Sequence, residues 1–258
     1  MFNDFSPLDP DRLQPYVYED ERTLSLHFDM CSTQSRMLRA DPFALALDYT
    51  RTMMGFLLVE PNPAAVLMIG LGGGSLAKYC HRHLPDADIT AVEINPHVID
   101  LRETFLVPAD DHRFRVVHGD GAQFVARADR RCDVLVVDGF SYDGQPAALS
   151  TPAFYRSCRA ALSPRGIAVI NLHNEEPECG MLADRIARAF DDDVRIAPSE
   201  CGGNRIVFAG RSADFDRCSV DFEARWAALA DVHRRTFRTC AARFARGLHA
   251  PSRSREAA

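Results

Sequence analysis

Three acidic residues, Glu93, Asp120 and Asp138, each stand at or just after the end of an apolar run of the sequence. If those runs form parallel strands, their carboxyl ends meet at one edge of a sheet, and ligands of open α/β sheets bind there. A carboxylate at that edge can accept hydrogen bonds from ribose hydroxyls or from an amine, and it can take a proton from an amine. The three acids therefore predict a nucleoside site with proton-transfer chemistry beside it.

A fourth apolar run, Ala64–Ile69, leads directly into a glycine-rich segment that contains Gly70, Gly72 and Gly74. Glycine lets the backbone turn tightly and approach a ligand closely, because no Cβ stands in the way. Glu93 follows at about 20 residues, the distance at which nucleotide-binding folds place the acid that holds the ribose diol. The segment predicts cofactor-binding glycines, although a glycine-rich turn can also serve close packing alone.

The acids and their neighbours have distinct predicted roles. We expect Glu93 to accept hydrogen bonds from both ribose hydroxyls, and Ile94 to lie against the base. Asp120, with Gly121 beside it, is expected to accept a hydrogen bond from an exocyclic adenine amine. Two alternatives stay open: Glu93 could be a surface acid, and Asp120 suits the N-cap of the following helix equally well.

The segment DGFSYDGQPAALST, which begins at Asp138, is long for a connection from strand to helix, whose usual length is about two to six residues. It contains a second acid, Asp143, beside Tyr142. Two carboxylates that face an adenosyl sulfonium could bind a cationic amine and remove its proton, which leaves a neutral nucleophile. We therefore predict Asp138 and Asp143 as catalytic and Tyr142 as a substrate contact. Asp143 could instead belong to a simple turn, with Tyr142 as an apolar lid.

Histidines and cysteines give weaker signals. His173 follows the fifth predicted strand and is a candidate substrate contact or second base, with a capping role as the alternative. His81 and His83 lie two positions apart on a predicted helix and therefore on different faces, so no shared metal site is expected. The eight cysteines include no CxxC pair, which indicates neither a zinc site nor a disulfide framework.

The composition excludes several function classes. The chain has 258 residues, of which 47% are hydrophobic and 26% charged, as is usual for globular proteins. Its formal net charge of −6 argues against a nucleic-acid partner and favours a cationic substrate. The sequence contains no apolar run of transmembrane length and no basic, then apolar, leader at its start. We expect no membrane partner and a cytoplasmic location.

The elements that would position these residues alternate between strand and helix. Predicted strands lie at 64–69, 88–93, 113–118, 132–138 and 167–172, and predicted helices at 74–84, 96–106, 120–128, 151–162 and 178–190. This alternation predicts a doubly wound, mostly parallel sheet in an α/β fold. A final hairpin at 194–197 and 205–209 brings the sheet to seven strands, which is typical of the class I methyltransferase fold rather than of a dehydrogenase.

The flanking segments predict smaller units. Strands at 16–19, 23–28 and 34–38 form a small N-terminal β region, followed by a helix over 43–58 that Asp41 would cap. A long helix over 221–247 and a disordered tail over 248–258 follow the sheet. We expect three units: the N-terminal β region and linking helix at 1–60, a nucleoside-binding domain at 61–212, and a C-terminal helix with its tail at 213–258.

The chain resembles the spermidine synthase (polyamine aminopropyltransferase) family over roughly 16–210, in stretches that include VLMIGLGGGSLAKYC, ITAVEINPHVID, FRVVHGDGAQFV and CDVLVVDGFSYDGQPAALS. Members of that family share the class I methyltransferase fold and transfer an aminopropyl group from decarboxylated S-adenosylmethionine to an amine, without a metal. The resemblance implies that Gln34 joins the glycine segment, Glu93 and Asp120 in holding the nucleoside. It also implies that Asp138 is the first acid of the catalytic loop and that the chain forms a homodimer.

The chain departs from the family pattern at three places. Gly73 stands where the family's glycine loop carries an aspartate, and Ser141 stands where the catalytic loop carries its second acid. A Tyr-His-Glu cluster that lines the family's amine site would fall near 45–47, and Asp48 with Tyr49 could partly replace it. The small-molecule amine acceptor is therefore not identified. Two alternatives stay open: a methyltransferase that uses intact S-adenosylmethionine, and a non-catalytic nucleoside-binding relative.

Overall fold

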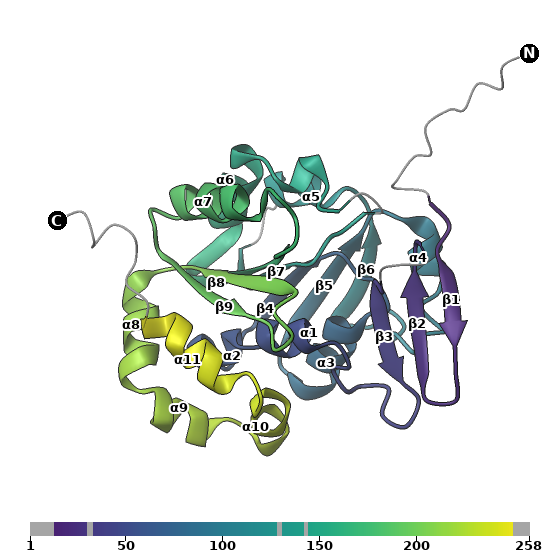
Figure 1. The fold of residues 1–258 in the computed structure, drawn as a ribbon, viewed down its shortest axis with the longest axis horizontal. Coiled ribbons are helices and arrows are strands. Elements are labelled where there is room, and N and C mark those ends of the chain that lie inside the picture. Colours follow the sequence, from purple (N-terminus) through teal and green to yellow (C-terminus); the bar gives the residue numbers. More distant parts are fainter. Residues whose placement is uncertain (1–12, 30–32, 128–130, 142–143, 250–258) are drawn as a thin grey trace, which may run out of the picture.

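A seven-stranded sheet forms the centre of the computed structural model, which describes residues 13–29, 33–127, 131–141 and 144–249 (Figure 1). The strand order is β6-β5-β4-β7-β8-β10-β9. Five strands run parallel, and β10 pairs antiparallel with both β8 and β9. This confirms the predicted α/β fold with its terminal hairpin. The strands are β4 (Ala65–Ile69), β5 (Asp88–Glu93), β6 (Phe114–His118), β7 (Cys132–Val137), β8 (Leu162–His173), β9 (Val194–Pro198) and β10 (Asn204–Ala209).

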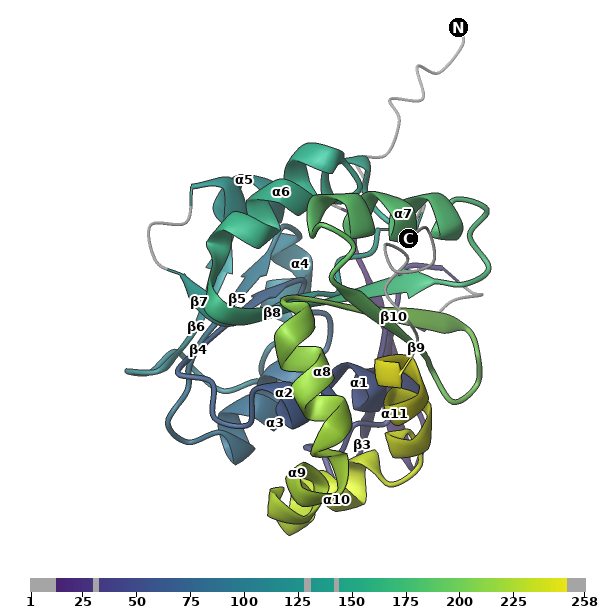
Figure 2. The same ribbon diagram turned by 90° about the vertical axis from the view of Figure 1, so that its left-hand side faces the viewer.

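Helices cover both faces of the sheet, which explains why its central strands are apolar on both sides (Figure 2). On β4, Val66 and Met68 join the core on one face, whereas Leu67 and Ile69 join the core on the other. One face is covered by α5 (Gly121–Ala126), α6 (Pro152–Ala161) and α7 (Cys179–Ala189). The other is covered by α1 (Asp48–Met53), α2 (Phe56–Val59), α3 (Ser75–His83), α8 (Ser212–Val220), α9 (Phe222–Ala228), α10 (Asp231–Phe237) and α11 (Ala241–His249). The short α4 (Pro96–Asp100) follows β5.

The predicted N-terminal β region is a three-stranded antiparallel sheet of β1 (Tyr16–Glu19), β2 (Thr23–His27) and β3 (Ser35–Leu38). Leu24 and Leu26 of β2 are buried in the main core. Ser35 at the start of β3 lies beside the glycine segment, with its hydroxyl oxygen 3.4 Å from that of Ser75. The small sheet therefore packs onto the element that follows β4.

The helix predicted over 43–58 is wrong in its extent. Residues 41–47 form turns instead, and the Asp41 carboxylate accepts the backbone N–H of Phe43. The guanidinium of Arg51 donates hydrogen bonds to the carbonyl oxygens of Leu45 and Ala46. These bonds give two backbone carbonyl groups of the non-helical segment a partner. Helical structure begins at Asp48 and breaks into α1 and α2 near Gly55.

The single helix predicted over 221–247 is also wrong. The segment forms α9, α10 and α11, with extended backbone at Leu229 and Ala230 between the first two. Alanine and arginine favour helix locally, but three short helices can bend around the core and bury Phe237, Cys240 and Phe244. Tertiary packing therefore overrides the local preference.

Three further observations concern the described part of the chain. No helix in it is long and apolar enough to cross a bilayer. Its cysteines at 80, 132, 158, 179, 201, 218 and 240 are all free thiols. Residues of β2, α1, α2 and α8 to α11 share one hydrophobic core with β4, so the predicted three-unit division stays a prediction.

Candidate functional site

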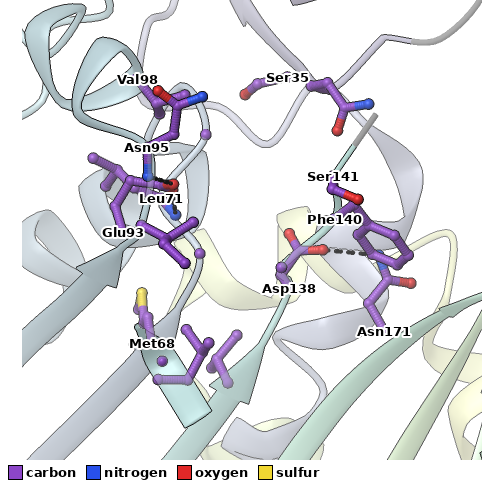
Figure 3. A pocket seen from close by; sticks show the side chains of 18 of the residues that line it. Ser35, Met68, Leu71, Glu93, Asn95, Val98, Asp138, Phe140, Ser141 and Asn171 are labelled. Atoms are coloured by element: carbon purple, nitrogen blue, oxygen red, sulfur yellow. Dashed lines mark hydrogen bonds between the residues drawn. The ribbon is translucent and has the colours of Figure 1, made fainter. Parts of the chain in front are cut away.

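A cavity opens at the carboxyl edge of the parallel strands, where the sequence predicts the site (Figure 3). Its walls come from the glycine segment after β4, the end of β5, the start of α5, the loop after β7, α1 and the N-terminal sheet. The predicted site residues that line it are Gln34, Gly70, Gly72, Glu93, Ile94, Asp120, Gly121, Asp138 and His173. Asp143 and Tyr142 lie outside the described residues.

Gly70 makes the turn after β4 possible. Its φ of +95° lies in the region that favours glycine, and a Cβ built there would sit 2.2 Å from the carbonyl oxygen of Asp138. The loops after β4 and β7 can approach only because Gly70 lacks a side chain. Gly74 is the N-cap of α3, with a φ of +68°, and it does not line the cavity. Its missing Cβ makes room for Val107. Its observed role is structural, in contrast to the predicted contact with the nucleoside.

Glu93 fixes the shape of the glycine turn from inside the cavity (Figure 3). Its Oε2 accepts the backbone N–H of Leu71 at 2.8 Å, and its Oε1 accepts that of Asn95 at 2.9 Å. Desolvation by burial raises the pKa of this carboxyl, and the backbone N–H groups lower it in part. Because Glu93 lines the cavity, its carboxylate can also meet the hydroxyl groups of a ribose bound there.

Asp120 lines the cavity and also caps α5. Its Oδ1 accepts the backbone N–H groups of Ala122 at 2.8 Å and Gln123 at 3.2 Å. The N-cap alternative is therefore observed, and the adenine contact stays a prediction for a residue that lines the cavity. Gly121 allows this helix to begin against β4, because a Cβ there would lie 2.3 Å from the Cγ2 atom of Ile69.

Asp138 is the carboxylate that the loop after β7 brings to the cavity. Its Oδ1 accepts the side-chain amide of Asn171 at 2.9 Å (Figure 3). Its Oδ2 accepts the hydroxyl of Tyr49 at 3.2 Å. Desolvation by burial raises the pKa of Asp138, whereas the hydrogen bonds from Asn171 and Tyr49 and the charge of His173 lower it in part. A carboxylate with a raised pKa is a stronger base than an exposed one.

Of the two partners of Asp138, Tyr49 was predicted, with Asp48, to replace part of the family's amine site, whereas Asn171 had no predicted role. Asn171 lies in the run GIAVINL, where one polar residue interrupts an apolar strand, and it is 1% exposed. Its position inside a buried strand was the available signal, because a buried amide needs a partner. Tyr49 lines the cavity from α1, next to the predicted Asp48.

Asp48 is a correction to the predicted substrate contacts. It does not line the cavity, and its Oδ2 accepts the backbone N–H of Cys201 at 2.6 Å. Successive residues on a helix point about 100° apart, so α1 directs Tyr49 into the cavity and Asp48 toward the β9–β10 hairpin. His173 does line the cavity, and its ring centroid lies 4.3 Å from that of Phe140. Within the described ranges, no three His, Cys, Asp or Glu side chains gather as metal ligands.

Comparison with known proteins adds to this geometry. Residues 47–185 match the family model for the spermine/spermidine synthase domain. A polyamine aminopropyltransferase of Chromobacterium violaceum is 38% identical to the chain over 198 residues, which are 76% of each protein.

Solved structures confirm the class I methyltransferase-like fold. A spermidine synthase in complex with the transition-state analogue AdoDATO has a TM-score of 0.62 and 20% identity, over 86% of this chain and 88% of that one. Human methyltransferase-like protein 13 in complex with SAH has a TM-score of 0.56 and 23% identity, over 79% and 93%. Because the family model spans more than half of the sequence and the curated relative is well above 30% identical, the chain belongs to the spermine/spermidine synthase family.

Proposed function

We propose that the protein transfers an aminopropyl group from decarboxylated S-adenosylmethionine to an amine acceptor, a step of polyamine biosynthesis. The observation that carries the proposal is the Asp138 carboxylate, held by two hydrogen bonds in a cavity that Glu93 and the glycine turn also line. The polyamine aminopropyltransferase of Chromobacterium violaceum, which matches 76% of the chain, supports the choice of reaction.

The nucleoside part of the donor fits the side of the cavity formed after β4 and β5. Glu93 would accept the ribose hydroxyls, and the turn at Gly70 and Gly72 would approach the donor closely. Asp120 would accept the adenine amine while Ile94, 37% exposed, provides an apolar wall. Three further residues complete the set predicted for the nucleoside side of the cavity. Gln34 would be a polar contact, Gly121 stands at the start of α5, and Gly74 supports α3.

The acceptor side of the cavity supplies the base. An ammonium has no lone pair, so a proton must leave the acceptor before its nitrogen can attack. Asp138 would take this proton, and the neutral nitrogen would attack the aminopropyl carbon beside the sulfonium. The carbon–sulfur bond breaks with its electron pair on sulfur, which releases methylthioadenosine. Asp143 as second acid, with Tyr142 and His173 as amine contacts, completes the predicted acceptor site.

The experiment offers purified protein each donor together with a mixed pool of diamines and reads the products by mass spectrometry. We expect methylthioadenosine and an amine heavier by one aminopropyl group with the decarboxylated donor. Asp138→Asn should lower that yield by about a thousandfold or more, because the base is lost. A methylated amine formed from intact S-adenosylmethionine would contradict the proposal.

A second candidate function is methyl transfer from intact S-adenosylmethionine. The shared fold of a methyltransferase solved with SAH supports it, as does Gly73, which stands where the family's glycine loop carries an aspartate. Calorimetric titration with both donors separates the candidates. Tight binding of the intact donor alone would favour methyl transfer, and binding without turnover of either donor would favour a non-catalytic relative.

We also propose a cytoplasmic homodimer. The family to which the chain belongs supports this proposal. Sedimentation of the purified chain measures its oligomeric state, and a monomer at micromolar concentration would contradict it. Fractionation of cells that express the full protein measures its location.

A further inference from the structure

Asp138 belongs to a polar network that extends beyond the cavity into the β9–β10 hairpin. The side-chain amide of Asn204 donates to the Asn171 Oδ1 atom at 3.0 Å, and the Asn171 amide donates to the Asp138 Oδ1 atom at 2.9 Å. Asn204 does not line the cavity, and among the described residues Asn171 bridges it to Asp138.

The strand register explains how the two asparagines meet. On β8 and β10, Ile206 is the partner of Asn171, and Asn204 is the partner of His173. Asn204 precedes Ile206 by two residues, so its side chain lies on the same face of the sheet as that of Asn171. The two are diagonal neighbours across the pair of strands, within reach of a hydrogen bond.

The direction of these hydrogen bonds matters for Asp138. A side-chain amide has one donor end and one acceptor end, and Asn171 could turn either end toward the carboxylate. Because Asn204 donates to the Asn171 oxygen, the Asn171 nitrogen is left to face Asp138. If Asn171 were reversed, its oxygen would face the ionised carboxylate, and two acceptors would repel each other.

The network also closes through α1. The hydroxyl of Ser199 accepts the backbone N–H of Asn204 at 3.2 Å and hydrogen-bonds to the Asp48 carboxylate. Tyr49, the next residue on α1, donates to the Asp138 Oδ2 atom. Asn171, which the hairpin supports through Asn204, therefore holds the Oδ1 atom of Asp138, and Tyr49 of α1 holds the Oδ2 atom.

We infer that Asn204 is a positioning residue for the proposed reaction: through Asn171 it keeps the Asp138 carboxylate ionised and oriented toward the acceptor amine. The inference rests on the proposed function only for its effect on turnover, since the ionisation of Asp138 is a property of the chain itself. The titratable groups that face Asp138 within the described residues are Tyr49 from α1 and His173 from β8. Both stay in place in the variants below.

The test compares Asn204→Ala and Asn204→Asp with the parent. Alanine removes the donor, so Asn171 is free to turn over. Aspartate reverses the interaction, because an ionised acceptor draws the Asn171 nitrogen toward itself and leaves the Asn171 oxygen against Asp138. A carboxylate that loses a donor holds its proton to higher pH. We expect Asp138 to ionise at higher pH in both variants, with the larger change for Asn204→Asp.

The readouts separate a positioning role from a folding role. Carbon-13 NMR of labelled Asp carboxyl groups, assigned with Asp138→Asn, follows the ionisation directly. We expect kcat to fall about tenfold in Asn204→Ala, the effect of losing the hydrogen bond from Asn171 to the charged Asp138, with KM for the donor nearly unchanged. Asn171→Leu should remove the effect of a second change at Asn204, because Asn204 then has nothing to orient.

A matched control lies at the same edge of the sheet. Asn174 donates to the Gly202 carbonyl oxygen and accepts from Arg205, and it has no contact with Asp138. Asn174→Ala should leave the ionisation of Asp138 as in the parent. If Asp138 ionises at the same pH in all Asn204 variants, the inference is wrong, whether or not the protein transfers aminopropyl groups. If the ionisation shifts while no aminopropyl product forms even in the parent, the proposed function fails and the positioning role stands.

Discussion

The carboxyl group of Asp138 couples the proposed chemistry to stability. Burial raises its pKa in the folded chain, so the folded state keeps a proton at pH values where the unfolded chain has released it. Stability contributed by this group therefore falls as pH rises from the ordinary aspartate pKa of about 3.9 through the raised value. An ionised Asp138 is a cost to the fold at neutral pH.

We predict that Asp138→Asn lowers turnover by about a thousandfold or more and yet raises the unfolding midpoint at neutral pH. At about pH 3, where the parent carboxyl is protonated in both states, the two midpoints should converge. Thermal unfolding followed by circular dichroism across this range measures the difference. Equal midpoints at neutral pH would mean that the hydrogen bonds from Asn171 and Tyr49 fully offset the desolvation.

Asp111 provides a control with the opposite sign. The backbone N–H of Arg113 and the side chain of His81 lower the pKa of Asp111 to about 2. The stability that this carboxyl contributes is therefore present above the ordinary aspartate pKa and is lost as pH falls. Asp111→Asn should therefore lower the unfolding midpoint at neutral pH. The opposite responses of the two aspartates distinguish this linkage from a general effect of removing a negative charge.

Glu93 is expected to control nucleoside affinity. In Glu93→Gln, one oxygen becomes an NH₂ group that faces the backbone N–H of Leu71 or Asn95, so two donors oppose each other. We expect calorimetry to show that methylthioadenosine binds about 10- to 100-fold more weakly, because the variant loses a buried, charged oxygen that accepts hydrogen bonds. The exposed Glu103, away from the cavity, supplies the control, and Glu103→Gln should bind as the parent does.

Among the secondary-structure elements, α1 is held in place by residues from the C-terminal part of the chain. Its Arg51 donates to the Glu200 carboxylate at 3.2 Å and to the carbonyl oxygen of Leu45 at 2.8 Å. Glu200 in turn accepts the hydroxyl of Thr239, between α10 and α11. The hairpin and the last helices therefore support the helix that carries Tyr49.

Arg51→Ala should lower kcat severalfold, because α1 would hold Tyr49 less firmly, and should lower the free energy of unfolding by about 1–2 kcal/mol. Methylthioadenosine affinity should stay unchanged, because Arg51 lies outside the nucleoside half of the cavity. Steady-state kinetics and urea unfolding measure both effects. Arg159, which pairs with Asp191 on the far face, is the control, and Arg159→Ala should cost at most about 1 kcal/mol with kcat intact.

The elements differ in how far the sequence could predict them. The buried strands were predictable, because apolar runs such as Val66–Ile69 need cover on both faces. The helices at 43–58 and 221–247 were mispredicted, because their breaks depend on distant partners. Gly55 sits against Phe244, whose ring a Cβ at Gly55 would approach to 2.7 Å. No local sequence pattern contains such a contact between residues from opposite ends of the chain.

The residues of the site also divide into those that the sequence could predict and those that it could not. Glu93, Asp120 and Asp138 were predictable from their places at strand ends, since parallel strands bring those ends together. Asn204 was not, because it appears in the sequence only as part of a glycine-rich turn. Its role depends on the register between β8 and β10, which the sequence does not state.

For the molecule as a whole, the shared core predicts cooperative unfolding. Leu26 of the N-terminal sheet, Met68 of β4 and Phe244 of α11 belong to one hydrophobic cluster. Units that share a core lose stability together, unlike domains with separate cores. The three-unit division predicted from the sequence would instead give separate transitions.

Trp226, the single tryptophan of the chain, lies on α9 and reports on the C-terminal helices, whereas far-UV circular dichroism reports on the whole fold. In urea, the two signals should show one coincident transition in the parent. Phe244→Ala removes a ring that packs 4.9 Å from the Phe208 ring on β10, so it should lower the free energy of unfolding by about 3–5 kcal/mol. Both signals should shift to the same lower midpoint. A shift of tryptophan fluorescence alone would show that residues 213–258 unfold as a separate unit, and the shared core would then not make the molecule cooperative.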